Sequence, residues 1–241
     1  INVDAAQYAS ISQEMLKSGS YFIVKYCGQD YLDKPPLLFW LAALSYKIFG
    51  IANWSYKLPS FIFTLIGVYA TYRLARSLYD KNVARLSALI LYTCQAFFLY
   101  NNDVRTDAIL TSSVITSIWL LYEFFESGKW KYLLSGSIFI SFGLMAKGPM
   151  GLMVPMLSLG THFLLKKEWK QILRLEWLLM LLIVLVLLLP MCYGLYKQYS
   201  WHGIKFFFWT QSFGRITGEN VWRNDAGYFY FVHTFLWSFM P

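Results

Sequence analysis

Residues 177–196 read WLLMLLIVLVLLLPMCYGLY, a run of twenty residues without a charged side chain. The hydrocarbon core of a bilayer is about 30 Å thick, and an α-helix of roughly 20 apolar residues spans it. Lipid offers the backbone no hydrogen-bond partner, so a crossing segment must be a helix or part of a closed barrel. The run therefore predicts a transmembrane helix, and it decides the class of the whole fold.

Apolar runs of similar character recur along the chain, separated by short basic connectors. Residues 37–51 are apolar but short, so we expect them to lie in the membrane interface or to enter the membrane only partly. The predicted fold is all-α, a polytopic transmembrane helical bundle with juxtamembrane helices on its outer side. Its further spans are predicted at residues 56–72, 86–100, 108–125, 132–146 and 150–165, with one more starting near Tyr228.

The composition agrees with this class. Of the 241 residues, 57% are hydrophobic and 14% are charged, whereas a soluble domain carries roughly 25% charged residues. The net charge is +8, but the basic residues stand in small groups between apolar spans, so no nucleic-acid partner is expected. The three cysteines lack the spacing of a metal or redox motif and are expected to be apolar fillers.

The chain starts at Ile1 without an initiator methionine or signal peptide and stops at Pro241, directly after an apolar run. We expect it to be the middle of a longer protein. Four regions are predicted within it: a periplasmic first loop with an amphipathic helix (1–36), a transmembrane helical region (37–198), a periplasmic aromatic-rich loop (199–227) and the start of a further transmembrane helix (228–241).

Basic residues concentrate on alternate connectors, which predicts the orientation. The rich connectors hold Arg73, Arg76, Lys81 and Arg85, then Lys129 and Lys131, then Lys166, Lys167, Lys170 and Arg174. The connectors between them hold only Arg105 or Lys147 as basic residues. By the positive-inside rule the rich set faces the cytoplasm. The segments expected on the opposite, outer side are 1–36, 101–107, 147–149 and 197–227.

Two features of the first outer segment could carry chemistry. Asp4 opens a predicted helix over residues 4–17, where it is a favoured N-cap and Gln7 completes a capping box. A capping carboxylate has a fixed orientation, so capping and catalysis are compatible. Lys34 precedes two prolines that stiffen its backbone. It is either an ordinary interfacial lysine before a helix start or an ammonium group fixed for a lipid phosphate.

Two further features fall on the same side. Asp103 and Asp107 are four residues apart, with Arg105 between them, and share a face if the helix begins early; alternatively, Asp107 caps the next helix within a polar turn. Lys147 is the single charge between two apolar runs. Such a lysine either snorkels to the surface or faces a cavity. Together, these carboxylates and cations at one membrane face fit chemistry on a phosphate whose tail stays in the bilayer.

The order of these motifs resembles the GT-C class of membrane glycosyltransferases, especially the bacterial branch similar to lipid A aminoarabinose transferases and protein O-mannosyltransferases. Many of those relatives carry a second acidic residue directly after the first, where this chain has Ala5. That difference argues against a paired-carboxylate metal site at Asp4. The motifs that carry the resemblance are DAAQYASISQEML from Asp4, DKPPLLFW from Asp33, RTD from Arg105 and KGP from Lys147.

The resemblance implies transfer of a sugar from a polyprenyl-phosphate donor to an envelope acceptor, which is lipid A, another glycolipid, a glycan or a protein. It implies a multi-pass protein of the bacterial inner membrane, with membrane lipid around it and an active site facing the periplasm. No cofactor is firmly implied, and a divalent metal ion stays open, with Asp33 as its ligand. The implied roles are catalysis by Asp4 and Asp107, and donor binding by Lys34, Arg105, Lys147 and Tyr8.

The alternative is a lipid or solute transporter or flippase of the inner membrane. Such proteins are expected to have charged or broken helices near the middle of several spans. A non-catalytic membrane scaffold is a further alternative. In this sequence the charges gather at the ends of the apolar runs, which favours the transferase.

Overall fold

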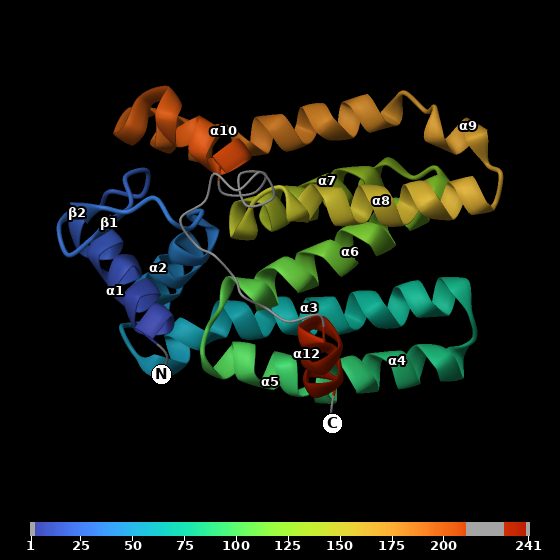
Figure 1. Ribbon diagram of the computed structural model, residues 1–241, viewed down its shortest axis with the longest axis horizontal. Helices are drawn as coiled ribbons and strands as arrows, with labels where there is room; N and C mark the ends of the chain where they lie inside the picture. The colour runs from blue at the N-terminus through green and yellow to red at the C-terminus, as the bar shows by residue number, and fades with distance from the viewer. Residues whose placement is uncertain (1–2, 211–228, 240–241) are drawn as a thin grey trace.

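A computed structural model describes residues 3–210 and 229–239 of the chain. Long helices dominate it and lie roughly side by side, with the N-terminal segments of the chain gathered at one end (Figure 1). The elements are α1 (Val3–Ser18), β1 (Lys25–Tyr26), β2 (Gln29–Asp30), α2 (Leu37–Phe49), α3 (Asn53–Leu78), α4 (Lys81–Thr93), α5 (Gln95–Asn102), α6 (Thr106–Ser127), α7 (Trp130–Lys147), α8 (Met150–Leu165), α9 (Trp169–Ile172), α10 (Glu176–Lys205), the π-helical turn η1 (Phe206–Thr210) and α12 (Tyr230–Ser238).

Several of these helices are long and apolar enough to cross a membrane. They are α3, α6 and the helical stretch Trp169–Thr210 that contains α10. Helices α4 and α5 meet the same criterion as a pair bent by 45°. The predicted spans at 132–146 and 150–165 form α7 and α8, and the short apolar run after Pro36 forms α2. The prediction of an all-α membrane bundle is confirmed.

The helices approach one another closely where small residues face across an interface. Gly67 of α3 packs against Ser112 of α6, and Gly151 of α8 packs against the backbone of α7 at Gly143. Lipid tails are as apolar as leucine, so burial alone gives helices little reason to associate, and close packing of small residues is a main source of attraction. These contacts hold the central layer α3–α6–α7–α8 together.

The basic connectors share one end of the bundle. The Arg73 guanidinium near the end of α3 lies 5.1 Å from the ring centre of Trp119 in α6. Ser77 donates a hydrogen bond of 2.6 Å to Glu123 of α6. Arg174, just before α10, stacks 5.4 Å from the ring centre of Phe124, also in α6. We call this the basic end. The opposite end, where α1 and α2 lie, is the α1 end (Figure 1).

Two local predictions need correction. Helix α1 runs Val3–Ser18, so Asp4 lies inside its first turn and is not the N-cap residue; Gly19, at φ +68°, ends the helix as expected. Residues 199–210 are helical and not a loop, because helical hydrogen bonding resumes after a break at Ser200 (φ 55°). Residues 211–228 of the predicted loop lie outside the described residues, and α12 follows them.

The contact between α7 and α8 generates a stability prediction. A Cβ atom added at Gly151 would overlap the backbone of Gly143 and Leu144. Because backbone atoms cannot rotate away, the substitution Gly151→Ala should force the helices apart and lower the free energy of unfolding by about 1–3 kcal/mol. Thermal denaturation in detergent measures this. Gly160→Ala is the matched control, since a Cβ there meets nothing within 4 Å; equal midpoints for the two variants would contradict the packing account.

Candidate functional site at the α1 end

The site is built around Tyr8 on the inner face of α1. The side chain is 4% exposed, and its ring contacts Phe39 of α2 at a centroid distance of 5.6 Å. Burial is the main reason why the pKa of the Tyr8 hydroxyl is raised above its usual value of 10.0. The charges of Asp4, Asp33 and Asp107 raise that pKa further, and the charge of Arg105 lowers it. Residues far apart in the sequence therefore surround one hydroxyl.

Asp107 and Lys147 meet although forty residues separate them. Lys147 Nζ donates to Asp107 Oδ1 at 2.5 Å. Asp107 lies in the first turn of α6, and Lys147 is the last residue of α7, which Gly148 ends with φ +82°. An up-and-down pair of helices brings the start of one beside the end of the other. The two side chains stay 29% and 40% exposed, so both remain accessible from outside the bundle.

Lys34 is held at the start of α2. Its ammonium donates to Asp33 Oδ2 at 2.8 Å, and its side chain is 20% exposed. The two prolines after it are buried. The Tyr31 hydroxyl also donates to Asp33, at 3.5 Å, and the Tyr31 ring contacts the ring of Phe39, as Tyr8 does. Sequence reasoning missed Tyr31, whose only signal was its position two residues before Asp33.

Arg105 belongs to the turn between α5 and α6. Its Nε donates to Asp103 Oδ2 at 3.2 Å. Val104 between them has φ 33° and is 1% exposed, so the turn is tightly folded with an apolar side chain inside. Asp103 and Asp107 were expected to share a helix face only if the helix began early, and α6 begins at Thr106, after Asp103. The alternative, a helix cap at Asp107, does not hold either, because Asp107 lies within the first turn and Arg105 is the N-cap residue. Each carboxylate takes a different cation instead.

Hydrogen bonds fix α1 over the bundle. The Tyr56 hydroxyl of α3 donates to the Ala5 carbonyl oxygen at 2.8 Å, within the turn that carries Asp4. Asp4 itself is exposed. The structure therefore brings Asp4, Lys34, Arg105, Asp107 and Lys147 to one end of the bundle, around Tyr8.

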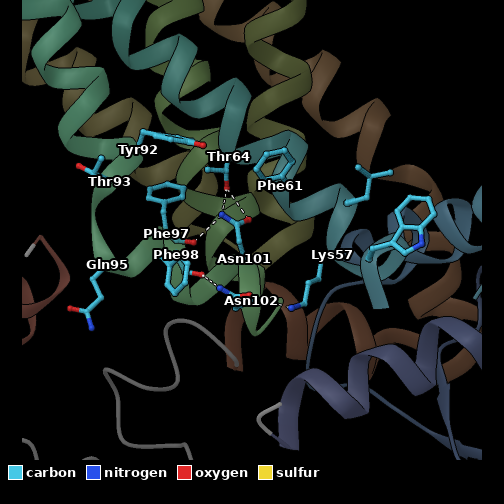
Figure 2. Close-up of a pocket in the computed structure, with 12 residues that line it drawn as sticks. Lys57, Phe61, Thr64, Tyr92, Thr93, Gln95, Phe97, Phe98, Asn101 and Asn102 are labelled. Atoms are coloured by element: carbon cyan, nitrogen blue, oxygen red, sulfur yellow. Dashed lines mark hydrogen bonds between the residues drawn. The ribbon is translucent and has the colours of Figure 1, made fainter. Parts of the chain in front are cut away.

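A cavity of about 1020 Å³ lies beside this cluster and not within it. It is formed by α3, α4 and α5 (Figure 2), and its lining includes aromatic side chains such as Phe61 and Phe98. At one edge Lys57 donates to Asn102 at 3.3 Å, and deeper in, Asn101 pairs with Thr64. The predicted site residues lie instead on α1, the loop before α2, the α5–α6 turn, α6 and α7.

A protein-held metal ion does not fit the residues that the structure describes. In residues 3–210 and 229–239, no three His, Cys, Asp or Glu side chains lie close enough together to hold one. Asp33, the predicted ligand, is bonded to Lys34 and Tyr31. An ammonium group beside a carboxylate competes with a cation for it. We therefore assign no step to a metal.

The raised pKa of Tyr8 predicts a pH effect on stability. In an unfolded chain a tyrosine titrates near pH 10, whereas in the fold the pKa of Tyr8 is higher. The fold then binds the proton more tightly, so this contribution to stability is complete below about pH 10 and is lost as the pH rises further. Relative to Tyr8→Phe, the wild type should lose thermal stability between about pH 10 and 11. A constant difference across that range would contradict the placement of Tyr8.

The comparisons with known proteins agree with this architecture. The family model described as dolichyl-phosphate-mannose-protein mannosyltransferase matches residues 33–193, about two thirds of the chain. An uncharacterized protein of Aquifex aeolicus is 32% identical over 178 residues, which are 70% of this chain and 34% of that protein. The undecaprenyl phosphate-alpha-4-amino-4-deoxy-L-arabinose arabinosyl transferase of Enterobacter sp. (strain 638) is 29% identical, over 99% of this chain and 43% of the relative.

Two solved structures share the fold. They are ArnT from Cupriavidus metallidurans in the apo state, with a TM-score of 0.85 and 21% identity, and the same protein bound to undecaprenyl phosphate, with a TM-score of 0.87 and 22% identity. Each similarity covers 99% of this chain and 44% of the other. The chain thus spans less than half the length of the relatives it matches. Its helices have the arrangement of a GT-C membrane transferase, and the chain belongs to the dolichyl-phosphate-mannose-protein mannosyltransferase family.

Proposed function

We propose that the protein transfers a sugar from a polyprenyl-phosphate donor to an acceptor of the cell envelope. The observation that carries this proposal is the meeting of Asp4, the Asp33–Lys34 pair and the Asp107–Lys147 pair at one end of a membrane bundle. The arabinosyl transferase relatives are named for an undecaprenyl-phosphate-linked sugar, and a protein of the same fold binds undecaprenyl phosphate. A lipid-borne phosphate reaches such a site from the bilayer edge.

Asp4 is the proposed base. It is exposed, and it stands in the first turn of α1, where the helix dipole stabilises a negative charge. As the acceptor hydroxyl attacks the anomeric carbon, Asp4 accepts its proton or orients it. The bond from that carbon to the phosphate oxygen breaks as the new bond forms, so the transfer inverts the configuration. Asp107 supplies a second carboxylate from α6.

Lys34 is the proposed anchor of the donor phosphate, assisted by Arg105 and Lys147. Negative charge grows on the leaving phosphate as its bond to the sugar breaks, and fixed cations stabilise it most at that moment. Lys34 is the least exposed cation among the three ion pairs at this end. Tyr8 is protonated at neutral pH, and burial raises the pKa of its hydroxyl further, so the hydroxyl is a hydrogen-bond donor near these charges.

We infer the orientation from the difference between the two ends of the bundle. At the basic end, Arg73 and Arg174 lie over aromatic rings of α6, and Glu123 accepts a hydrogen bond from Ser77. Under the positive-inside rule that end is cytoplasmic. The α1 end would then face the periplasm, where polyprenyl-linked sugars meet envelope acceptors.

The transporter alternative has one structural feature in its favour, the 45° break between α4 and α5. Broken helices in transporters usually surround a bound ion or charged substrate. Here the residues at the break are Thr93, Cys94 and Gln95, and Cys94 is 2% exposed. The break therefore offers no charged group to a solute, and the transferase remains the better proposal.

The base assignment is tested with Asp4→Asn in the full-length protein. Loss of a general base typically costs about 10²–10⁴-fold in rate, so kcat for sugar transfer should fall by that factor while donor affinity changes little. Asp80→Asn is the control, because Asp80 caps α4 at the basic end and asparagine also caps helices. Near-normal transfer by Asp4→Asn would remove Asp4 from catalysis.

The phosphate anchor is tested with Lys34→Ala. A hydrogen bond to a charged group contributes about 1.5–3 kcal/mol, so affinity for undecaprenyl phosphate should fall by roughly 10–100-fold. Tryptophan fluorescence or scintillation proximity with radiolabelled undecaprenyl phosphate measures the affinity. Lys129→Ala, at the opposite end of the bundle, should bind like the wild type. Unchanged affinity in Lys34→Ala would exclude Lys34 as the anchor.

A further inference from the structure

The loop that carries Lys34 is fastened to a helix far away in the sequence. We call residues 19–36 the Lys34 loop. The Gln198 side chain of α10 accepts a hydrogen bond from the Val24 backbone N–H at 3.1 Å and donates to the Val24 carbonyl oxygen at 2.9 Å. It also donates to Asp30 Oδ1 at 2.8 Å. One amide side chain thus pairs with the loop backbone as a neighbouring strand would.

A second contact lies one helical turn earlier on α10. Gly194 packs so closely against the carbonyl oxygen of Phe22 that an added Cβ would overlap it. The Phe22 ring meets the ring of Tyr193 edge-on, at a centroid distance of 5.7 Å. Glycine is required here for space, since a backbone group of the loop occupies the position of a side chain. The loop therefore rests directly on the surface of α10.

A series of hydrogen bonds connects these contacts to Lys34. Besides the bond from Gln198, the Val24 carbonyl oxygen accepts a hydrogen bond from the Tyr31 backbone N–H at 3.0 Å, across the β1–β2 hairpin. Tyr31 in turn bonds to Asp33, which pairs with Lys34. Lys34 and Gln198 both line a small enclosed space of about 20 Å³, which has room for about one water molecule. A movement of α10 relative to the loop would therefore shift the Lys34 ammonium group.

We propose that Gln198 and Gly194 are positioning residues for the donor site. Their contacts hold the Lys34 loop against the C-terminal part of α10 and thereby determine the position of Lys34. This rests on the proposed function, in which Lys34 binds the donor phosphate. Glutamine suits the role because it donates and accepts at once. A glutamate would lose the donor and set a negative charge beside Asp30. A leucine would leave the Val24 N–H without its partner and remove one of the two hydrogen bonds to the Val24 carbonyl oxygen.

The direct test is Gly194→Ala against Gly160→Ala in the full-length protein. The expected result for Gly194→Ala is an affinity for undecaprenyl phosphate weakened about tenfold, with the donor KM raised to match and kcat at saturating donor within about twofold of wild type. A general loss of folding would lower kcat and active enzyme instead. Gly160→Ala should match the wild type in every measurement, because a Cβ there meets no neighbour.

A second test changes the charge at position 198, where the side chain contacts Asp30. Gln198→Glu should weaken donor binding, because two carboxylates then face each other at the position of the Gln198–Asp30 hydrogen bond. Asp30→Asn in that background removes the repulsion and restores a donor. It should recover a substantial part of the affinity, whereas Asp30→Asn alone should change affinity little. If Asp30→Asn fails to restore donor binding in Gln198→Glu, the proposed positioning role of Gln198 is overturned.

Amide hydrogen exchange of residues 20–30 separates the outcomes. If Gln198 and Gly194 hold the loop on α10, the Val24 amide should exchange faster in Gly194→Ala and Gln198→Glu than in Gly160→Ala. If the wild type binds no undecaprenyl phosphate, the proposed function falls and this inference falls with it. If the wild type binds it and Gly194→Ala binds as tightly as Gly160→Ala, the inference alone is overturned.

Discussion

A bilayer core provides no water to solvate a backbone amide or a charged side chain, and the rest of this structure follows from that constraint. Helices satisfy their own backbone, so the chain crosses as helices, and ionic groups are displaced to the helix ends. Because the connectors alternate between ends, the two ends acquire different chemistry. The basic end gathers arginines stacked on aromatic rings, such as Arg73 on Trp119. The α1 end gathers carboxylates paired with cations, such as Asp107 with Lys147. A site for an ionic substrate with a lipid tail can form only at such an end.

Helices alone do not complete the site. Asp4 and Lys34 lie on segments that rest on the bundle, and each segment needs a hydrogen bond to a helix to hold its place. Tyr56 of α3 fixes the first turn of α1 through the Ala5 carbonyl. Trp40 of α2 donates to the Tyr21 carbonyl oxygen at 2.6 Å, and Gln198 of α10 bonds to Val24 on the other side of the same loop. Polar side chains near the helix ends thus convert a membrane scaffold into a defined arrangement of charges.

Much of this could be predicted from the sequence, for a physical reason. Span length and charge placement are local properties, and up-and-down topology then brings Asp107 and Lys147 to one end without any knowledge of their contact. The break at Cys94 was not predicted, because residues 86–100 carry no charge and hydropathy carries no information about a bend. Gln198 was also missed. Its partners are Val24 and Asp30, more than 160 residues away, and no periodicity links a helical glutamine to a hairpin backbone.

The ion pairs at the α1 end bear on how a donor would be received under the proposed function. Lys34 and Lys147 each already hold a carboxylate, so an arriving phosphate must compete with Asp33 and Asp107 for them. The donor phosphodiester carries one negative charge, as a carboxylate does, but further charge develops on it as its bond to the sugar breaks, so the lysines stabilise it most in the transition state. As Lys147 turns to the phosphate, Asp107 loses its ion-pair partner, and its carboxylate is free to contact the acceptor. Binding of the donor and release of the second carboxylate are then coupled through one lysine. In this arrangement the second carboxylate becomes available only once the leaving group is in place.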